Sequence, residues 1–389
     1  MHILHIFTDG HFFSPNNKKW FKLFRKHEDI KVSVIIQEPE NHIKERFHYQ
    51  YGYYFNILYF QNKNTLLKNN YINNFFYLKK FARQIDQIKP DIIHIHGLYF
   101  TYIVLPLLFI KCKPKIIMNV WGRDFNLSYY NTFKNRILFK WLFKKSHLIW
   151  TNWLSMADTI RSKFPKYNHK IRTIPLGVTD DLFLKSKETD KISITEKLNI
   201  HKDEYLIIYT RGFSMNSNYH KIIEALGKID NDTPYKVIFQ HFKHNQNMDE
   251  YLYKLINEFS LQNKVIISHL ELSDGEMKAL YELADLTFSV TTKEQFSRTI
   301  HEAILTNTNL ILNDIEPYRY LKYFFNWNVD LIDVENTDQL AKKIKHFITE
   351  KPSPNWEYEK NIIQKVFRFE NKEELFKIVY EDLIHEKIK

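Results

Sequence analysis

The 389-residue chain contains a single cysteine, Cys112, so it can form no internal disulfide framework, and this usage suits a reducing compartment. Its N-terminal stretch, MHILHIFTDG, lacks the basic region of a secretory signal peptide, and its apolar run is short, which predicts a first β-strand instead. The longest apolar run, residues 102–110, is too short to cross a bilayer. These absences predict a cytoplasmic protein without a membrane-spanning segment.

Acidic residues are scarce in the first half of the chain only. Residues 1–180 carry 28 Lys and Arg against 11 Asp and Glu, a surplus of 17, whereas residues 181–389 carry 28 against 34, a deficit of 6. A basic half joined to a mildly acidic half indicates that only the first half meets a polyanion, an anionic membrane or a phosphorylated substrate.

Length and pattern predict two α/β domains, because 389 residues exceed what one compact core usually holds. Short runs rich in Ile, Val, Leu and Tyr alternate with helix-length segments such as residues 72–88 and 129–145. Strands that are apolar throughout are typical of parallel sheets covered on both faces. The expected strands are residues 2–7, 31–36, 55–60, 91–97, 115–122, 147–152 and 170–178, and then 205–212, 235–242, 264–271, 285–292, 309–314 and 329–334.

The fold class we predict is α/β, with two tandem Rossmann-like domains that face each other across a cleft. The polar stretch between the two series of strands has no clear periodicity and reads as a linker. The last forty or so residues look wholly helical, and we expect them to cross back to the N-terminal domain. The expected boundaries are an N-terminal domain at 1–178, a linker at 179–203, a C-terminal domain at 204–350 and C-terminal helices at 351–389.

Polar side chains follow two strands of the second domain, where such folds bind ligands. Arg211 ends the first strand, where its guanidinium could meet a phosphate. Glu294 and Glu302 bracket the turn after the fourth strand, and a carboxylate can accept hydrogen bonds from two neighbouring sugar hydroxyls. A single glutamate near a helix start is ordinarily only a partner of the helix dipole. Together with the arginine, the pair describes a nucleotide-sugar pocket.

Three ordered motifs carry a resemblance to a known family. They are IPLGVTDDLF at 174–183, TRGFSMNSNYHKIIEAL at 210–226 and ELADLTFSVTTKEQFSRTIHEA at 282–303. The chain resembles the retaining glycosyltransferases of GT-B fold, most closely family 4, in which two glutamates are likewise separated by seven residues. The resemblance implies that Glu294 contacts the donor sugar, Glu302 the ribose and Arg211 the diphosphate.

The chain departs from the family pattern at two places. The second phosphate-binding cation of the family, usually a lysine, falls here near Ser217 and Asn218, and Arg298 is a candidate to replace it. The glycine-containing stretch after the first glutamate has become residues 295–297, and Phe296 there implies a differently shaped sugar pocket. The further donor-binding candidates are therefore Gln295, Phe296, Ser297 and Arg298.

Candidates in the first domain also lie at strand ends. In DIIHIHG, His94 and His96 fall on the same side of the strand, and His96 is nearer its carboxyl end. The resemblance implies a histidine here near the donor's anomeric carbon, so we name His96 as a catalytic candidate beside Glu294. A satisfied core histidine is the alternative. The acceptor-side candidates, which follow the first and fifth strands, are Gly10, His11, Arg123 and Asp124.

No metal or cofactor is expected beyond the nucleotide sugar itself. The DND stretch at 230–232 lies in a polar turn after a helix rather than at a strand end, so we read it as a loop. His2, His5, His241 and His244 do not share a face with cysteines or carboxylates in a zinc-like pattern.

Residues 16–26 and 133–145 are predicted helices that combine cations with aromatic side chains. Such faces suit an anionic membrane surface, although a solvated basic face has the same pattern. In the first helix Trp20 and Phe24 accompany Lys18, Lys22 and Arg25. In the second we expect a stripe of Arg136, Lys140 and Lys144 flanked by Phe139 and Phe143, with Phe133, Ile137, Leu138, Trp141 and Leu142 on the core side.

The sequence thus predicts a glycosyltransferase of hexosyltransferase type that moves a sugar from a nucleoside diphosphate sugar to an acceptor hydroxyl. The basic helices point to a lipid-linked or surface-polysaccharide acceptor and to peripheral contact with the inner face of the cell membrane. A sugar-nucleotide epimerase of the same fold needs no acceptor and is one alternative. A non-catalytic polyanion-binding protein is another, although no nucleic-acid-binding motif is present.

Overall fold

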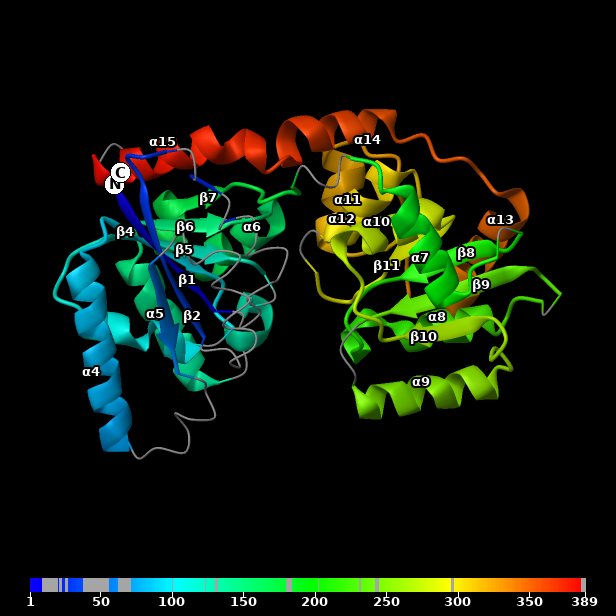
Figure 1. Cartoon of the computed structure of the whole chain (residues 1–389), viewed down its shortest axis with the longest axis horizontal. Helices are drawn as coiled ribbons and strands as arrows, with labels where there is room; N and C mark the ends of the chain where they lie inside the picture. Colours follow the sequence, from blue (N-terminus) through cyan, green and yellow to red (C-terminus); the bar gives the residue numbers. More distant parts are fainter. Residues whose placement is uncertain are drawn as a thin grey trace. The chain divides into compact units, whose positions relative to one another are not determined.

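The chain forms two compact α/β units (Figure 1). The first unit contains residues 1–176 and 369–389, and the second contains residues 177–368. The protein is seen here as a computed structural model. It describes residues 1–8, 20, 23–24, 27–37, 56–61, 71–99, 101–122, 124–129, 132–179, 184–201, 203–230, 232–241, 245–294 and 297–385.

The first unit is built on a seven-stranded parallel sheet with the order β3-β2-β1-β4-β5-β6-β7. The strand order reverses between β1 and β4, which pair in parallel and place His5 opposite His94 and Phe7 opposite His96. The continuous apolar runs are buried on both faces of this sheet, as predicted. The strands are β1 (His2–Phe7), β2 (Lys31–Gln37), β3 (Asn56–Phe60), β4 (Ile92–His96), β5 (Lys115–Val120), β6 (Leu148–Thr151) and β7 (Ile171–Thr173).

Helices cover both faces of this sheet. One core contains side chains of α4, η2, α5 and α6, and the opposite core contains side chains of α15, which include Phe376 and Tyr380. The helical elements of the unit are α4 (Tyr71–Ile88), η2 (Thr101–Leu108), η3 (Asp124–Tyr129), α5 (Phe133–Lys145), α6 (Leu154–Lys163), η4 (Pro165–Lys170), η9 (Glu370–Lys372) and α15 (Glu373–Ile384).

Helix α5 buries a different face from the one that we predicted. Phe139, Leu142 and Phe143 are buried in the core, whereas Phe133 and Ile137 are 74% and 52% exposed. The prediction was wrong for Phe133 and Ile137, which were expected on the core side, and for Phe139 and Phe143, which were expected beside the cations, because the helix offers two apolar stripes. The stripe formed by Phe139, Leu142 and Phe143 packs on the sheet, and Phe133 and Ile137 therefore point outward beside the cations.

The aromatic residues of the 16–26 segment are buried rather than exposed. Trp20 is 1% exposed and Phe24 is 3% exposed, and both belong to the core beneath α15. The prediction that they flank a membrane-facing basic stripe was therefore wrong. Lys18, Lys22 and Arg25 of that segment lie outside the described residues.

Membrane-spanning segments are not found in the part of the chain that the structure describes. None of its helices combines the length and the apolar character that crossing a bilayer requires.

The second unit is built on a six-stranded parallel sheet with the order β10-β9-β8-β11-β12-β13. Its strands are β8 (Tyr205–Tyr209), β9 (Tyr235–Gln240), β10 (Val265–Ser268), β11 (Leu286–Ser289), β12 (Asn309–Asn313) and β13 (Asp330–Ile332). Its helical elements are α7 (Glu188–Leu198), η6 (Met215–Ser217), α8 (Tyr219–Leu226), α9 (Gln246–Glu258), α10 (Asp274–Leu283), α11 (Arg298–Thr306), α12 (Glu316–Arg319), η7 (Tyr320–Phe324), α13 (Thr337–Glu350), α14 (Glu357–Ile362) and η8 (Ile363–Phe367). With the first unit, this confirms the predicted pair of parallel-sheet α/β domains.

The segment that we predicted as a linker contains a helix of the second unit. Ile194 and Leu198 of α7 are buried in one cluster with Ala279 and Leu280 of α10. Two apolar positions four residues apart are too few to stand out from the charged residues around them, so the sequence pattern did not reveal this helix.

Gly177 begins the second unit in a conformation that needs glycine. Its φ is +68°, and a Cβ added there would lie 1.7 Å from the carbonyl oxygen of Phe367. This close approach lets the amide of Val178 donate a 2.7 Å hydrogen bond to the same oxygen. The glycine of the IPLGV motif therefore joins the start of the second unit to its last helical segment.

Candidate functional site

The candidate site of the second unit lies where its strand order reverses, at the carboxyl ends of β8 and β11. Arg211 follows β8, and the loop after it is held by buried hydroxyl groups. Tyr219 Oη donates to the carbonyl of Arg211 at 2.5 Å, and Tyr209 Oη donates to the carbonyl of Ser217 at 2.7 Å. The Ser217 hydroxyl in turn donates to the carbonyl of Gly212 at 2.6 Å. These bonds fix the loop that carries the arginine.

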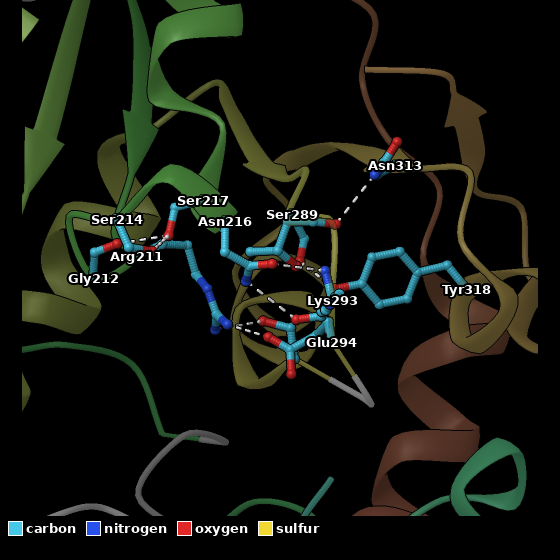
Figure 2. A network of polar contacts seen from close by, with 12 residues as sticks. Arg211, Gly212, Ser214, Asn216, Ser217, Ser289, Lys293, Glu294, Asn313 and Tyr318 are labelled. Carbon is cyan, nitrogen blue, oxygen red and sulfur yellow. Dashed lines mark hydrogen bonds and ion pairs between the residues drawn. The ribbon is translucent and has the colours of Figure 1, made fainter. Parts of the chain in front are cut away.

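The loop after β11 is tied to the loop after β8. The amide of Lys293 donates to Asn216 Oδ1 at 3.0 Å, and Asn216 Nδ2 donates to the carbonyl of Lys293 at 3.3 Å. The amide of Thr292 donates to the carbonyl of Asn216 at 3.0 Å. Asn218 Nδ2 donates to the carbonyl of Val290 at 2.7 Å. The loops after β8 and β11, about 75 residues apart in sequence, are therefore joined into one continuous wall of the candidate site (Figure 2).

Arg211 from the loop after β8 and Glu294 from the loop after β11 point toward each other and form an ion pair (Figure 2). Both side chains are largely buried, at 27% and 17% exposed. Arg211 also donates from Nη1 to the Ser297 hydroxyl at 3.1 Å. Burial opposes the charge of Arg211, but the neighbouring Glu294 carboxylate raises the pKa of the guanidinium above its ordinary value. The ion pair and the hydrogen bond to Ser297 fix the guanidinium, and the predicted Arg211, Glu294 and Ser297 lie together.

The second predicted glutamate lies on the first turns of α11. Glu302 is 11% exposed at its side chain, and Arg298 Nε lies 2.8 Å from its Oε1. Burial and the Glu302 charge together raise the pKa of the neighbouring Tyr281 phenol. Arg298, our candidate for the missing phosphate-binding cation, is therefore engaged by a carboxylate of its own helix.

Buried tyrosines surround the candidate site, and the sequence analysis did not identify them. Tyr281 Oη lies 2.5 Å from the hydroxyl of Thr210, and Tyr318 Oη lies 2.7 Å from the hydroxyl of Ser289. A strand-end or helix position alone does not mark such residues, because an apolar pattern accommodates tyrosine as readily as phenylalanine. The four fully buried tyrosines of this region are Tyr209, Tyr219, Tyr281 and Tyr318.

Several predicted residues lie outside the described part of the chain. These are Gln295 and Phe296 after the first glutamate and Gly10, His11 and Arg123 on the acceptor side.

In the first unit His96 belongs to a buried histidine cluster where the strand order reverses between β1 and β4. His5 Nδ1 and His96 Nε2 are 2.8 Å apart, and His94 Nδ1 lies 2.8 Å from Tyr380 Oη on α15. Burial lowers the pKa of His5 to about 3, and burial with the neighbouring His5 lowers the pKa of His94 well below its ordinary value. Both rings are therefore neutral at pH 7.

The histidine cluster has the composition of a metal site but not its geometry. One nitrogen from each of His5, His94 and His96 lies within 4.8 Å of the others. A zinc ion lies about 2.0–2.1 Å from each imidazole nitrogen and in the plane of each ring. Here the rings are stacked, with centroids 4.1 to 5.6 Å apart and planes within 36° of parallel. Stacked rings do not direct three lone pairs at one point, so the cluster fits a hydrogen-bonded network better.

Asp124, an acceptor-side candidate, is fully buried just after β5. The amide of Gly122 donates to its Oδ1 at 2.7 Å, and its Oδ2 has no hydrogen-bond partner among the described residues. Burial raises the pKa of Asp124 to about 6, against the effect of nearby backbone amides. Asn119, on the same sheet edge, is also buried and makes no side-chain hydrogen bond to the described residues.

Two sequence families match the chain. Residues 190–367 match the family described as Glycosyl transferases group 1, and residues 25–182 match Glycosyltransferase Family 4. Together the two matches cover both units. Comparison with curated protein sequences finds no significant match.

Solved structures of similar fold cover nearly the whole chain. A glycosyltransferase from Rickettsia africae ESF-5 is 16% identical with a TM-score of 0.75, and the alignment covers 98% of each chain. Anabaena Alr3699/HepE in complex with UDP-glucose is 15% identical with a TM-score of 0.76, covering 98% of this chain and 100% of that one. The lipopolysaccharide outer core galactosyltransferase WaaB is 11% identical with a TM-score of 0.66 over the full length of both. At these identities the likeness concerns the fold.

Proposed function

We propose that this chain, which belongs to the family 4 glycosyltransferases of GT-B fold, moves a hexose from a nucleoside diphosphate sugar to a hydroxyl of a lipid-linked or surface glycan. The observation that carries the proposal is the fixed Arg211–Glu294 pair at the strand-order reversal of the second unit, with Glu302 eight positions further on. Such a position binds ligands in open α/β sheets. The sugar-binding HepE complex has the same fold.

Each of the three residues has a distinct task in this proposal. The guanidinium of Arg211 binds the diphosphate through its planar set of donors. Glu294 accepts hydrogen bonds from the sugar hydroxyls, and it holds Arg211 in place before the donor arrives. Glu302 accepts from the ribose hydroxyls at the start of α11, and Arg298 and Tyr281 orient its carboxylate.

The reaction breaks the bond between the anomeric carbon and the diphosphate oxygen and forms a bond from that carbon to the acceptor oxygen. The acceptor proton leaves with the diphosphate, so atoms and charges balance. Attack on the same face retains the anomeric configuration and needs no protein nucleophile. The site accelerates this step by stabilising the negative charge that develops on the leaving diphosphate, for which Arg211 is already positioned and partly desolvated. His96 remains our candidate for the group nearest the anomeric carbon.

A nucleotide screen tests the donor site. We expect one of the UDP, GDP and TDP sugars, added at millimolar concentration without metal, to raise the melting temperature of the full chain, because a ligand that binds only the folded state stabilises it. Glu302→Gln should reduce that shift. Glu258→Gln, at an exposed position of α9, is the matched control and should leave the shift unchanged. If none of these nucleotides shifts the melting temperature, the donor assignment is wrong.

The lipid-linked acceptor is supported by the exposed face of α5. Arg136, Lys140 and Lys144 are exposed on this helix together with Phe133 and Ile137, and the helix contains no acidic residue. Cations beside exposed apolar side chains suit the headgroup region of an anionic membrane, where the apolar groups insert and the cations pair with lipid phosphates. We therefore propose peripheral contact of this face with an anionic membrane, at the inner face of the cell membrane.

A second helix on the same side of the sheet strengthens this proposal. Helix α4 packs on the same face of the sheet as α5 and exposes Ile72, Phe75 and Phe76 on its first turns. Each helix leads back to the start of the next parallel strand, so the first turns of both lie towards the carboxyl edge of the sheet, where acceptors would bind.

Vesicle binding tests the membrane face. We expect the full chain to co-sediment with vesicles that contain phosphatidylglycerol and not with pure phosphatidylcholine. Arg136→Gln with Lys140→Gln should weaken that binding about 30-fold, because each cation near an anionic surface contributes about 1 kcal/mol. Phe133→Ser with Ile137→Ser should also weaken it. Phe324→Ser, an exposed aromatic change in the second unit, is the control. Equal binding of all variants would contradict the assignment of this face.

A further inference from the structure

We propose that Lys293 is the second cation that binds the diphosphate of the donor. This inference rests on the proposed function and assigns a residue that the sequence analysis did not consider. A nucleoside diphosphate brings at least two negative charges into the site, and a single guanidinium does not neutralise them.

The two arginines of the described site are already engaged. Arg211 is the one basic residue between positions 211 and 218, and it is paired with Glu294. Arg298 lies against Glu302 on the same helix. Each arginine charge is thus matched by a carboxylate before any donor binds. Without another cation, the diphosphate would enter a wall with no net positive charge.

Lys293 lies next to the loop after β8, the loop in which the family's second cation is absent. Its main chain is bound from both sides by the side chain of Asn216, which lies in the loop after β8 (Figure 2). Lys293 directly precedes Glu294, the partner of Arg211. The hydrogen bonds to Asn216 therefore hold the backbone of Lys293 beside the phosphate-binding loop. In effect, Asn216 supplies no charge itself but fixes the residue that does.

The ammonium group of Lys293 is available for a ligand. The residue is exposed, and among the described residues no carboxylate lies within ion-pair distance of it. Lysine is a compact charge on a flexible stem, so it can adjust to a phosphate without a preformed fork of donors. Because Lys293 is hydrated rather than paired, binding a phosphate does not require breaking an existing ion pair.

Binding of UDP, UMP and uridine tests the proposal, with the corresponding series for whichever base the nucleotide screen selects. We expect Lys293→Ala to raise the dissociation constant for the diphosphate about tenfold and to leave nucleoside binding unchanged. Lys293→Arg should restore most of the affinity, and the alanine variant should show a weaker dependence on salt. Lys254→Ala, at an exposed position of α9, is the matched control. Calorimetric titration of the full chain gives all these constants.

The role of Asn216 supplies a second readout. We expect Asn216→Ala to weaken diphosphate binding and the combination with Lys293→Ala to weaken it no further than Lys293→Ala alone, because both changes remove the same positioned charge. If the wild type binds UDP and Lys293→Ala binds it equally well, Lys293 is not the second cation. If the wild type binds no nucleoside diphosphate at all, the proposed function itself is overturned, and the role of Lys293 with it.

Discussion

Arg211→Ala is expected to lower kcat/KM for glycosyl transfer about a thousand-fold, the scale seen when one preorganised donor to a developing negative charge is removed. The guanidinium of Arg211 lies between the loops after β8 and β11, and Glu294 and Ser297 fix its orientation. Its loss removes charge stabilisation that grows as the diphosphate leaves, so kcat should fall together with kcat/KM. Steady-state release of nucleoside diphosphate measures both.

The same change has a structural cost that a control must separate. Without Arg211 the Glu294 carboxylate, 17% exposed, is left without its cation, which destabilises a protein by about 3–5 kcal/mol. Arg211→Ala with Glu294→Gln removes the stranded charge, so it should recover much of the stability and none of the activity. Arg319→Ala, which breaks an exposed ion pair with Asp314, should leave turnover unchanged. An Arg211→Ala enzyme within tenfold of wild type would contradict the assignment.

Acidification from pH 7 to pH 5 is expected to lower the free energy of unfolding of the first unit by about 3 kcal/mol. The pKa of His5 is about 3 and that of His94 is well below its ordinary value in the folded chain. Unfolding lets both rings bind protons below about pH 6.5, so stability falls as the pH falls. Asp124 opposes this loss, because its folded pKa of about 6 lies above its unfolded value and its protonation favours the folded state below pH 6.

Variants at these three positions separate the two effects. His94→Gln keeps an acceptor for Tyr380 and should roughly halve the histidine contribution to the pH dependence. Asp124→Asn removes the stabilisation that Asp124 gains by protonation, so the decrease in the free energy of unfolding between pH 7 and pH 5 should grow to about 4 kcal/mol. His169→Gln changes an exposed histidine of the same unit and is the control. Urea unfolding at both pH values measures the differences, and a pH-independent stability in wild type would show that the buried histidines do not control it.

The sheets were predictable because parallel strands are apolar throughout. The run at 31–36 became β2, and the run at 309–314 became β12, each within a residue or two of the expected bounds. Helices with two competing faces were not predictable. Phe133 and Phe139 of α5 are equally apolar, and only the packing on the sheet decides which is buried.

The sequence predicted where the site residues lie but not which side chains contact each other. Arg211 and Glu294 follow strands, so their place at the carboxyl edge could be derived from the strand pattern. The ion pair between them, the Arg298–Glu302 pair and the bonds from Asn216 to Lys293 join residues whose contacts depend on the packing of separate loops or on rotamers. No local pattern encodes such contacts, which is why Lys293 was overlooked and Arg298 was considered for its role.

The most direct test of the central claim is a proton NMR time course of the full chain with the selected nucleotide sugar and lipid-linked glycans extracted from the producing cells. The account predicts that the donor's anomeric signal disappears, that nucleoside diphosphate is released in equal amount, and that the new glycosidic bond has the donor's anomeric configuration. Inversion at that carbon, or conversion of the donor to an epimer without release of diphosphate, would contradict it. An unchanged donor, when Arg211 and Glu294 are intact, would contradict it as well.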